Sequence, residues 1–71
     1  MLMNKTDILI LKELSFSKDL VSIEKIPSAF KSDFNSFFFG KTLVKDNNDN
    51  LLAYPHDIKK WVQHVFLKYK D

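Results

Sequence analysis

The chain has no cysteine and no arginine, and only one glycine and two prolines. Without cysteine, neither a disulfide framework nor a thiolate zinc site can stabilise the fold, and a reducing compartment is permitted. So few chain-breaking residues, together with 45% hydrophobic and 14% aromatic residues, argue against disorder. At 71 residues, the sequence predicts a single domain, residues 1–71, that depends on the packing of a small core.

Long apolar runs are also missing. No stretch approaches the ~20 residues that a membrane span needs. In the opening segment MLMNKTDILILKEL, Lys5 and Asp7 precede the apolar run and Lys12 and Glu13 end it, which is not the pattern of a signal peptide. We expect a soluble, cytoplasmic protein without a membrane partner.

The net charge of +2 comes entirely from the second half of the chain. Residues 1–40 carry five lysines and five acids, whereas residues 41–71 carry six lysines and four acids. Nucleic-acid binding is disfavoured by so small an excess, and by the lack of arginine, the side chain best shaped to bind phosphate or guanine with two hydrogen bonds.

The C-terminal segment PHDIKKWVQHVFLKYKD predicts an amphipathic helix. Its apolar residues recur at i, i+3, i+4, i+7, i+8 and i+11, the spacing of one helical stripe. They are Ile58, Trp61, Val62, Val65, Phe66 and Tyr69. Pro55 suits the first turn of this helix. We expect Trp61 at the centre of the core, packed by Phe30, Phe34 and Phe37 and by the inner face of the hairpin.

A second helix is predicted over residues 28–39, with four phenylalanines on one face: Phe30, Phe34, Phe37 and Phe38. Pro27 disfavours helical angles in the residue before it, and Gly40 is suited to leave the helix through a left-handed conformation.

The remaining elements follow from shorter patterns. The runs TLV and LLAY, separated by KDNNDN, predict a β-hairpin. Residues 7–15 predict a helix capped by Asn4 or Thr6, and residues 20–26 a short helix. The expected fold class is therefore α+β: a small, mostly helical single domain with the order helix, short helix, helix, β-hairpin, helix.

The stretch FFFGKTLVKDNNDN contains fragments of two ligand-binding motifs. Gly40, Lys41 and Thr42 match the end of a phosphate-binding loop, but Asn35 stands where its first glycine belongs, and Gly40 ends a helix rather than starting one. Asp46, Asn48 and Asn50 match the start of a calcium loop. That loop needs glycine where Leu51 stands and a longer glutamate where Asp57 stands. We therefore interpret the stretch as a helix end followed by a turn.

Catalytic motifs are also missing. His56 and His64 are more than two helical turns apart and cannot bind one ion from one helix. No serine lies in a nucleophile-elbow pattern. We expect no enzymatic activity, no bound metal and no cofactor.

Two residues fall outside the apolar stripes and indicate a binding surface. On a helical wheel, Phe39 and Leu67 point away from the core. The alternative for Phe39 is that the end of its helix unwinds and tucks the side chain into the core. Leu67 lies among Lys59, Lys60 and His64, and these five residues form the predicted partner-binding site. The leading hypothesis is a non-catalytic protein-binding module of the inhibitor, antitoxin, immunity or adaptor type. Its partner would be another protein, with a homodimer as a further option. The residue usage, rich in Lys, Asn, Ile and Phe without Arg, is compatible with a bacterial or phage origin.

The alternative hypothesis is a winged-helix-like DNA-binding regulator. Residues 28–39 would then be the recognition helix, with KDNNDN as the wing tip and an outward face made of Lys31, Ser32, Asn35 and Ser36. Electrostatics oppose this interpretation. Asp46 and Asp49 at the wing tip would be repelled by phosphates, and Asp33 offsets Lys31.

We predict that the loop binds neither calcium nor nucleotide specifically, because Leu51 and Asn35 occupy the positions where those loops need glycine. Isothermal titration with calcium and with ATP should give no saturable heat at micromolar concentrations. A clear micromolar isotherm for either ligand would contradict the interpretation of the loop as a turn.

Overall fold

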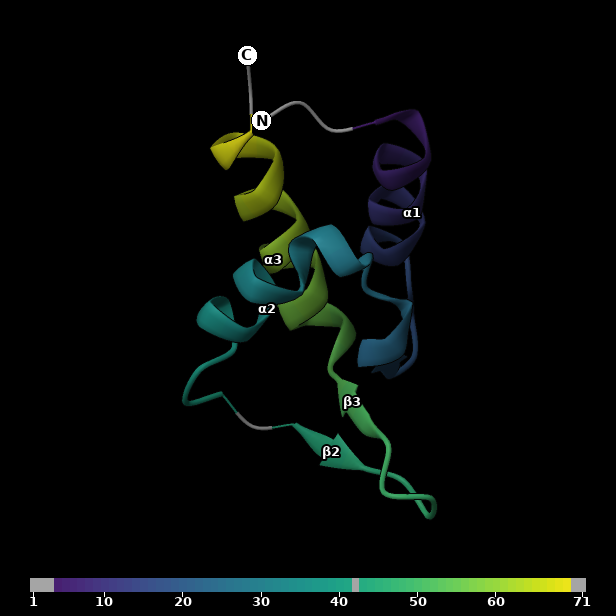
Figure 1. The fold of residues 1–71 in the computed structure, drawn as a ribbon. Helices are drawn as coiled ribbons and strands as arrows, with labels where there is room; N and C mark the ends of the chain where they lie inside the picture. The colour runs from purple at the N-terminus through teal and green to yellow at the C-terminus, as the bar shows by residue number, and fades with distance from the viewer. Residues whose placement is uncertain (1–3, 42, 70–71) are drawn as a thin grey trace.

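The computed structural model describes residues 4–41 and 43–69. Its helices are α1 (Lys5–Ser15), α2 (Lys31–Phe37) and α3 (Pro55–Lys68), its strands are β1 (Val21–Ser22), β2 (Val44–Lys45) and β3 (Leu51–Ala53), and its 3₁₀ turns are η1 (Ile23–Lys25) and η2 (Ser28–Phe30). Helices α1 and α3 pack side by side in opposite directions, α2 crosses α3, and the β2–β3 hairpin extends from the end of the molecule opposite the start of α1 and the end of α3 (Figure 1). The predicted α+β class is confirmed.

The three strands form one antiparallel sheet in the order β1-β3-β2. Val44 pairs with Leu52 across the predicted hairpin, and Val21 pairs with Ala53 on the other side of β3. The prediction of a short helix over residues 20–26 is wrong in its first half, because Val21 and Ser22 are the strand β1 and only residues 23–25 are helical. A two-residue strand is too short to show a period. Strand β1 forms because Val21 is buried beside its partner Ala53.

Helix α1 begins at Lys5, two residues before the predicted start, and ends at Ser15 as predicted. The Asn4 side chain accepts a hydrogen bond from the backbone N–H of Asp7 at 2.8 Å, so Asn4 rather than Thr6 is the cap. Helix α3 starts at Pro55, as expected for a proline in the first turn.

Helix α2 is shorter than the predicted span of residues 28–39. It begins with the 3₁₀ turn η2 and its α-helical part ends at Phe37, two residues early. Gly40 has φ of 81°, the left-handed conformation that ends the helix, and the N–H of Lys41 bonds to the carbonyl of Phe38 at 3.0 Å. A Cβ at Gly40 would meet nothing within 4 Å, so glycine is favoured here by its backbone angle and not by lack of space.

The hairpin loop is an Asx turn built on Asp46. One carboxylate oxygen of Asp46 accepts hydrogen bonds from the backbone N–H groups of Asn48 at 2.8 Å and of Asn50 at 3.0 Å. These bonds, with that of Asn50 the stronger cause, hold the pKa of the Asp46 carboxyl below its usual value. Asp49 adopts φ of 62°, which completes the reversal. The carboxylate with which a calcium loop would start is therefore bonded to its own backbone.

The core draws on all three helices and two strands. Its buried residues are Leu11, Leu14, Val21, Ile26, Phe30, Phe34, Phe38, Ala53, Ile58, Trp61, Val62 and Val65. Trp61 is the largest fully buried side chain, as predicted, and Phe34 meets it in a T-shaped contact with ring centroids 5.3 Å apart. Phe38 stacks on Phe34 at 4.2 Å. Phe37 is only half-buried, so the expectation that it packs centrally around Trp61 is wrong, and Phe38 lies closer to the core centre.

Replacing Trp61 by alanine should remove about 3–5 kcal/mol from the free energy of unfolding, because the large side chain is fully enclosed. For so small a domain, this change should unfold much of the population. Chemical denaturation followed by circular dichroism provides the measurement. Leu67→Ala is the matched control, since Leu67 is 74% exposed and its loss should change stability by less than about 0.5 kcal/mol. An unchanged melting temperature for Trp61→Ala would refute the central position of this residue.

Candidate functional site

Four of the five predicted partner-binding residues lie on the exposed face of α3. This helix buries Ile58, Trp61, Val62 and Val65, so its opposite face is turned to solvent. Lys60, His64 and Leu67 follow one another there at i, i+4 and i+7, with Lys59 at the edge of the same face. Leu67 is 74% exposed, although Val62 and Val65 on the other face of the same helix are buried.

Phe39, the fifth predicted residue, is 89% exposed. Two adjacent features of the chain turn it outward. Phe38, the C-cap of α2, is buried against Phe34, and Gly40 then reverses the chain in its left-handed conformation. The alternative considered for this residue, that the helix end unwinds and tucks Phe39 into the core, is wrong because Phe38 takes that place.

The end of α2 and the exposed face of α3 meet at Phe37. Its ring lies against the imidazole of His64 with centroids 5.4 Å apart, and the ammonium of Lys41 lies 5.3 Å from the same ring centroid. We call the surface formed by these two elements the α2–α3 surface. Its members are Phe37, Phe39, Lys41, Lys60, His64 and Leu67. The contact of His64 with Phe37 thus brings α3 against the end of α2, next to the turn that carries Phe39. The role of these residues in binding stays a prediction.

Phe37 and Lys41 are members that sequence reasoning did not find. Phe37 was assigned to the core stripe because it lies seven residues after Phe30. A signal against that assignment was present in the pair Phe37 and Phe38: neighbours in a helix point roughly 100° apart, so both cannot face the centre of the core. Nothing local in the sequence marks Lys41 as a neighbour of Phe37.

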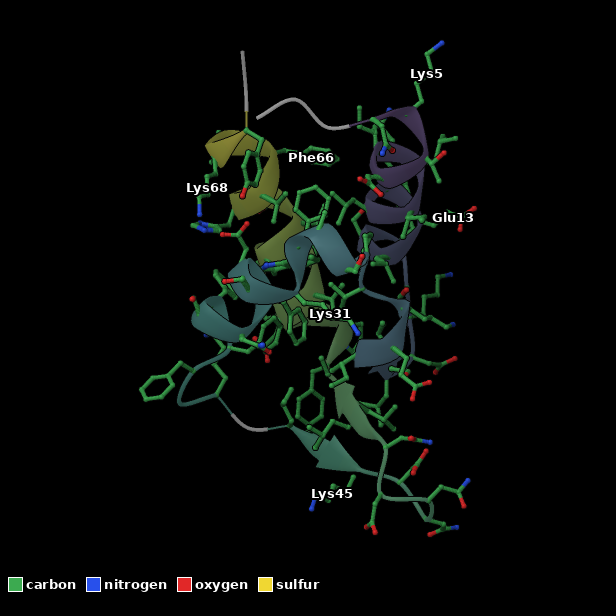
Figure 2. All side chains as sticks on the ribbon, in the orientation of Figure 1. Lys5, Glu13, Lys31, Lys45, Phe66 and Lys68 are labelled. Atoms are coloured by element: carbon green, nitrogen blue, oxygen red, sulfur yellow. The ribbon has the colours of Figure 1, made fainter. Side chains whose placement is uncertain are left out.

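A polar cluster fastens α2 to the end of α3. The Asp33 carboxylate accepts hydrogen bonds from the ammonium of Lys68 and from the hydroxyl of Tyr69. Figure 2 shows Lys68 reaching from the last turn of α3 toward α2. Because 35 and 36 residues separate Asp33 from these partners, no sequence periodicity could predict the cluster.

The cluster shifts the acidity of all three groups. The hydrogen bond from Lys68, and next that from Tyr69, holds the pKa of Asp33 below its usual value. Conversely, the same carboxylate raises the pKa values of Lys68 and Tyr69. The side chain of Asp33 is only 13% exposed, so its negative charge is compensated within the protein. It therefore does not offset Lys31 in the way that the sequence suggested.

Three further features were considered as sites: a metal cluster, a membrane-spanning helix and a pocket. Within residues 4–41 and 43–69, no group of three or more histidine, cysteine, aspartate or glutamate side chains could hold a metal ion. None of the described helices is long and apolar enough to cross a membrane. A pocket of about 420 Å³ lies between α1 and η1, lined by Ile10, Glu13, Leu14, Ser17 and Lys25, and none of the predicted partner-binding residues lines it.

Comparison of the chain with protein-family models, with curated proteins and with solved structures finds no match. Function is therefore argued from the chemistry of the surface itself.

The Asp33 cluster should make stability depend on pH in a defined direction. A carboxyl whose folded-state pKa lies below its ordinary 3.8 contributes stability above pH 3.8 and loses that contribution as the pH falls through the lower, folded-state value. Asp33→Asn should therefore lower the melting temperature near neutral pH, and its difference from the wild type should shrink in acid.

Thermal unfolding monitored by circular dichroism from about pH 7 to about pH 2 measures this difference. Asp19→Asn, at an exposed loop position, is the control for loss of a carboxylate. If Asp33→Asn shows the same deficit at every pH, or none at neutral pH, the proposed cluster does not stabilise the fold.

Proposed function

We propose that the protein is a non-catalytic module that binds another protein through the α2–α3 surface. The observation that carries the proposal is the 89% exposure of Phe39, a large apolar side chain held outward by the Phe38–Gly40 turn. Exposed patches built from apolar side chains mark interaction sites, and buried aromatic anchors dominate interface energies. Phe39 is the proposed anchor, and Leu67 is a second apolar contact.

The charges of the α2–α3 surface indicate which charges the partner should carry. Lys41 and Lys60 belong to the α2–α3 surface, Lys59 borders it, and none of its six members is acidic. Asp33, which lies close enough to His64 for the imidazole to help lower its pKa, is already bonded to Lys68 and Tyr69. The partner should therefore present an apolar pocket for Phe39 with carboxylates at its rim, since complementary rim charges speed association.

This arrangement is suited to the inhibitor, antitoxin, immunity or adaptor classes. Such proteins act by occupying a partner's surface, which a 71-residue domain can do with a single anchored patch. The proposal includes action in the cytoplasm, which the absence of cysteine supports because the fold needs no oxidising compartment.

A second candidate function, DNA binding by a winged-helix-like arrangement, is favoured by two observations. The β2–β3 hairpin directly follows α2 in the chain, and β3 lies between β1 and β2 in the sheet, an order that resembles a recognition helix followed by a wing. Pairing of Asp33 with Lys68 also leaves Lys31 and Asn35 exposed on α2 without a free carboxylate between them.

Two features rank this candidate second. The α-helical part of α2 has only seven residues. The hairpin loop presents the carboxylates of Asp46, whose pKa is held below its usual value by the backbone N–H groups of Asn50 and Asn48, and of the exposed Asp49. Two carboxylates at the wing tip would repel the phosphates against which a wing usually lies.

Phe39→Ser should weaken partner binding about tenfold or more while leaving the melting temperature near that of the wild type, because the side chain is exposed. The partner is first identified by capture from the native cell, with and without nuclease, and mass spectrometry. It is then purified for calorimetric titration against Phe39→Ser and Leu67→Ser. Phe16→Ser is the matched control, because Phe16 is a 79% exposed aromatic residue at the C-cap of α1, outside the α2–α3 surface. This variant should bind the partner with the affinity of the wild type.

Two results decide between the candidates. Retained affinity in both Phe39→Ser and Leu67→Ser would reject the α2–α3 surface as the binding site. If nuclease removes the captured material, and if Lys31→Glu or the pair Lys59→Glu and Lys60→Glu abolishes salt-sensitive binding to DNA, the second candidate replaces the first.

A further inference from the structure

The pocket between α1 and η1 takes no part in the α2–α3 surface. One of its walls is formed by Ile10, Glu13 and Leu14 of α1 and by Ser17, just beyond the helix. At 100° per residue, the three helical positions fall within an arc of about 100°, with Leu14 at the inner edge and Glu13 at the outer edge. Lys25 of η1 forms the opposite wall. The volume of about 420 Å³ lies in the range of roughly 300–1,000 Å³ that is usual for small-molecule sites.

The inner part of the pocket is apolar and is held in place by the core. Leu14 is buried as a member of the core, and Ile10 is a partly buried residue that packs against it. Because these side chains are already ordered by packing, an apolar group that covers them loses little free energy to further ordering of the protein. The inner part of the pocket is therefore suited to a small aliphatic group.

The two walls carry opposite charges that do not neutralise each other. Within residues 4–41 and 43–69, Asp33 and Lys68 form the only ion pair at 4.0 Å or less, so the charged atoms of Glu13 and Lys25 are farther apart than that. Figure 2 shows Glu13 projecting from α1 on the side away from α3. An occupant with a single charge would be attracted by one wall and repelled by the other. A wholly apolar occupant would lie between two charges without pairing either.

We propose that the pocket binds a free α-amino acid with an apolar side chain. The ligand's carboxylate accepts hydrogen bonds from the Lys25 ammonium, and its own ammonium group donates to the Glu13 carboxylate. The ligand's side chain lies on Ile10 and Leu14, and the Ser17 hydroxyl supplies a further polar contact. This binding goes beyond the proposed function, because none of the residues that line the pocket belongs to the α2–α3 surface.

Titration of the isotope-labelled protein with leucine at constant pH and salt, followed by NMR, tests the proposal. The backbone amides of the residues that line the pocket should shift saturably, with a dissociation constant of about 1–10 mM, because both ion pairs are open to water. Three related compounds separate the contributions of the ligand's groups. Glycine lacks the apolar side chain, isocaproate lacks the ammonium group and isoamylamine lacks the carboxylate. Each should bind at least about threefold more weakly than leucine.

Two charge-neutralising variants assign the contacts, and both change exposed residues, so the fold should stay intact. Glu13→Gln should bind leucine no better than isocaproate, because the ammonium group loses its partner, but should still prefer leucine to isoamylamine. Lys25→Gln should bind leucine no better than isoamylamine and still prefer it to isocaproate. Lys12→Gln is the matched control, because Lys12 is exposed on α1 outside the pocket, and it should bind leucine with the affinity of the wild type.

Phe39→Ser should also bind leucine normally, so failure here is distinguishable from failure of the proposed partner surface. A wild type that shows no saturable shifts up to about 50 mM leucine would overturn the proposal. Equal affinity for leucine and its three analogues would overturn it as well, because such binding would be non-specific. So would a Glu13→Gln variant that still discriminates leucine from isocaproate as strongly as the wild type does, or shifts that cluster away from the pocket.

Discussion

The rest of the fold depends on the T-shaped contact between Phe34 and Trp61. A helix of seven residues is far too short to persist on its own in water, so α2 exists only because it is held against α3. Phe34 supplies the apolar part of that attachment, and Asp33, the preceding residue, supplies the polar part through Lys68 and Tyr69. Helix α3 in turn buries its stripe against α1. The position of Phe39 is therefore a consequence of how firmly Trp61 is enclosed.

Sequence patterns predicted the parts of this structure whose causes are local. The start of α3 at Pro55, the cap at Asn4, the end of α2 before Gly40 and the hairpin around Asp46 all follow from the conformational preferences of single residues or from short periods. The exposure of Phe39 and Leu67 also followed from helical geometry.

What could not be predicted depends on residues distant in the chain. Strand β1 exists because Val21 pairs with Ala53, 32 positions later, and a pair of residues shows no period of its own. The bonds of Asp33 and the contact of Phe37 with His64 likewise join α2 to α3. Four of the six members of the α2–α3 surface were therefore visible from the sequence, whereas its connection across the two helices required the three-dimensional arrangement.

The net charge of the chain is small, but its acidic and basic groups are not equally exposed in the fold. Asp33 and Asp46 both bind groups of the protein itself, one through side chains and the other through the backbone of its own turn. Lysines at the junction of α2 and α3, by contrast, lie at the surface, with Lys41 over an aromatic ring. Counting charges along the sequence treats these groups alike, and so it underestimates how basic one face of a small protein can be.

Trp61 also gives the molecule a built-in optical reporter. It is the only tryptophan in the chain, it is fully shielded from water, and its indole N–H has no hydrogen-bond partner among the described residues. An indole in so dry and apolar a setting emits at shorter wavelength than one in water. The tryptophan fluorescence of the protein therefore originates at the centre of its core, beside Phe34. A substitution that acts only at the surface leaves this emission unchanged, whereas one that loosens the helices around α3 admits water and shifts it to the red.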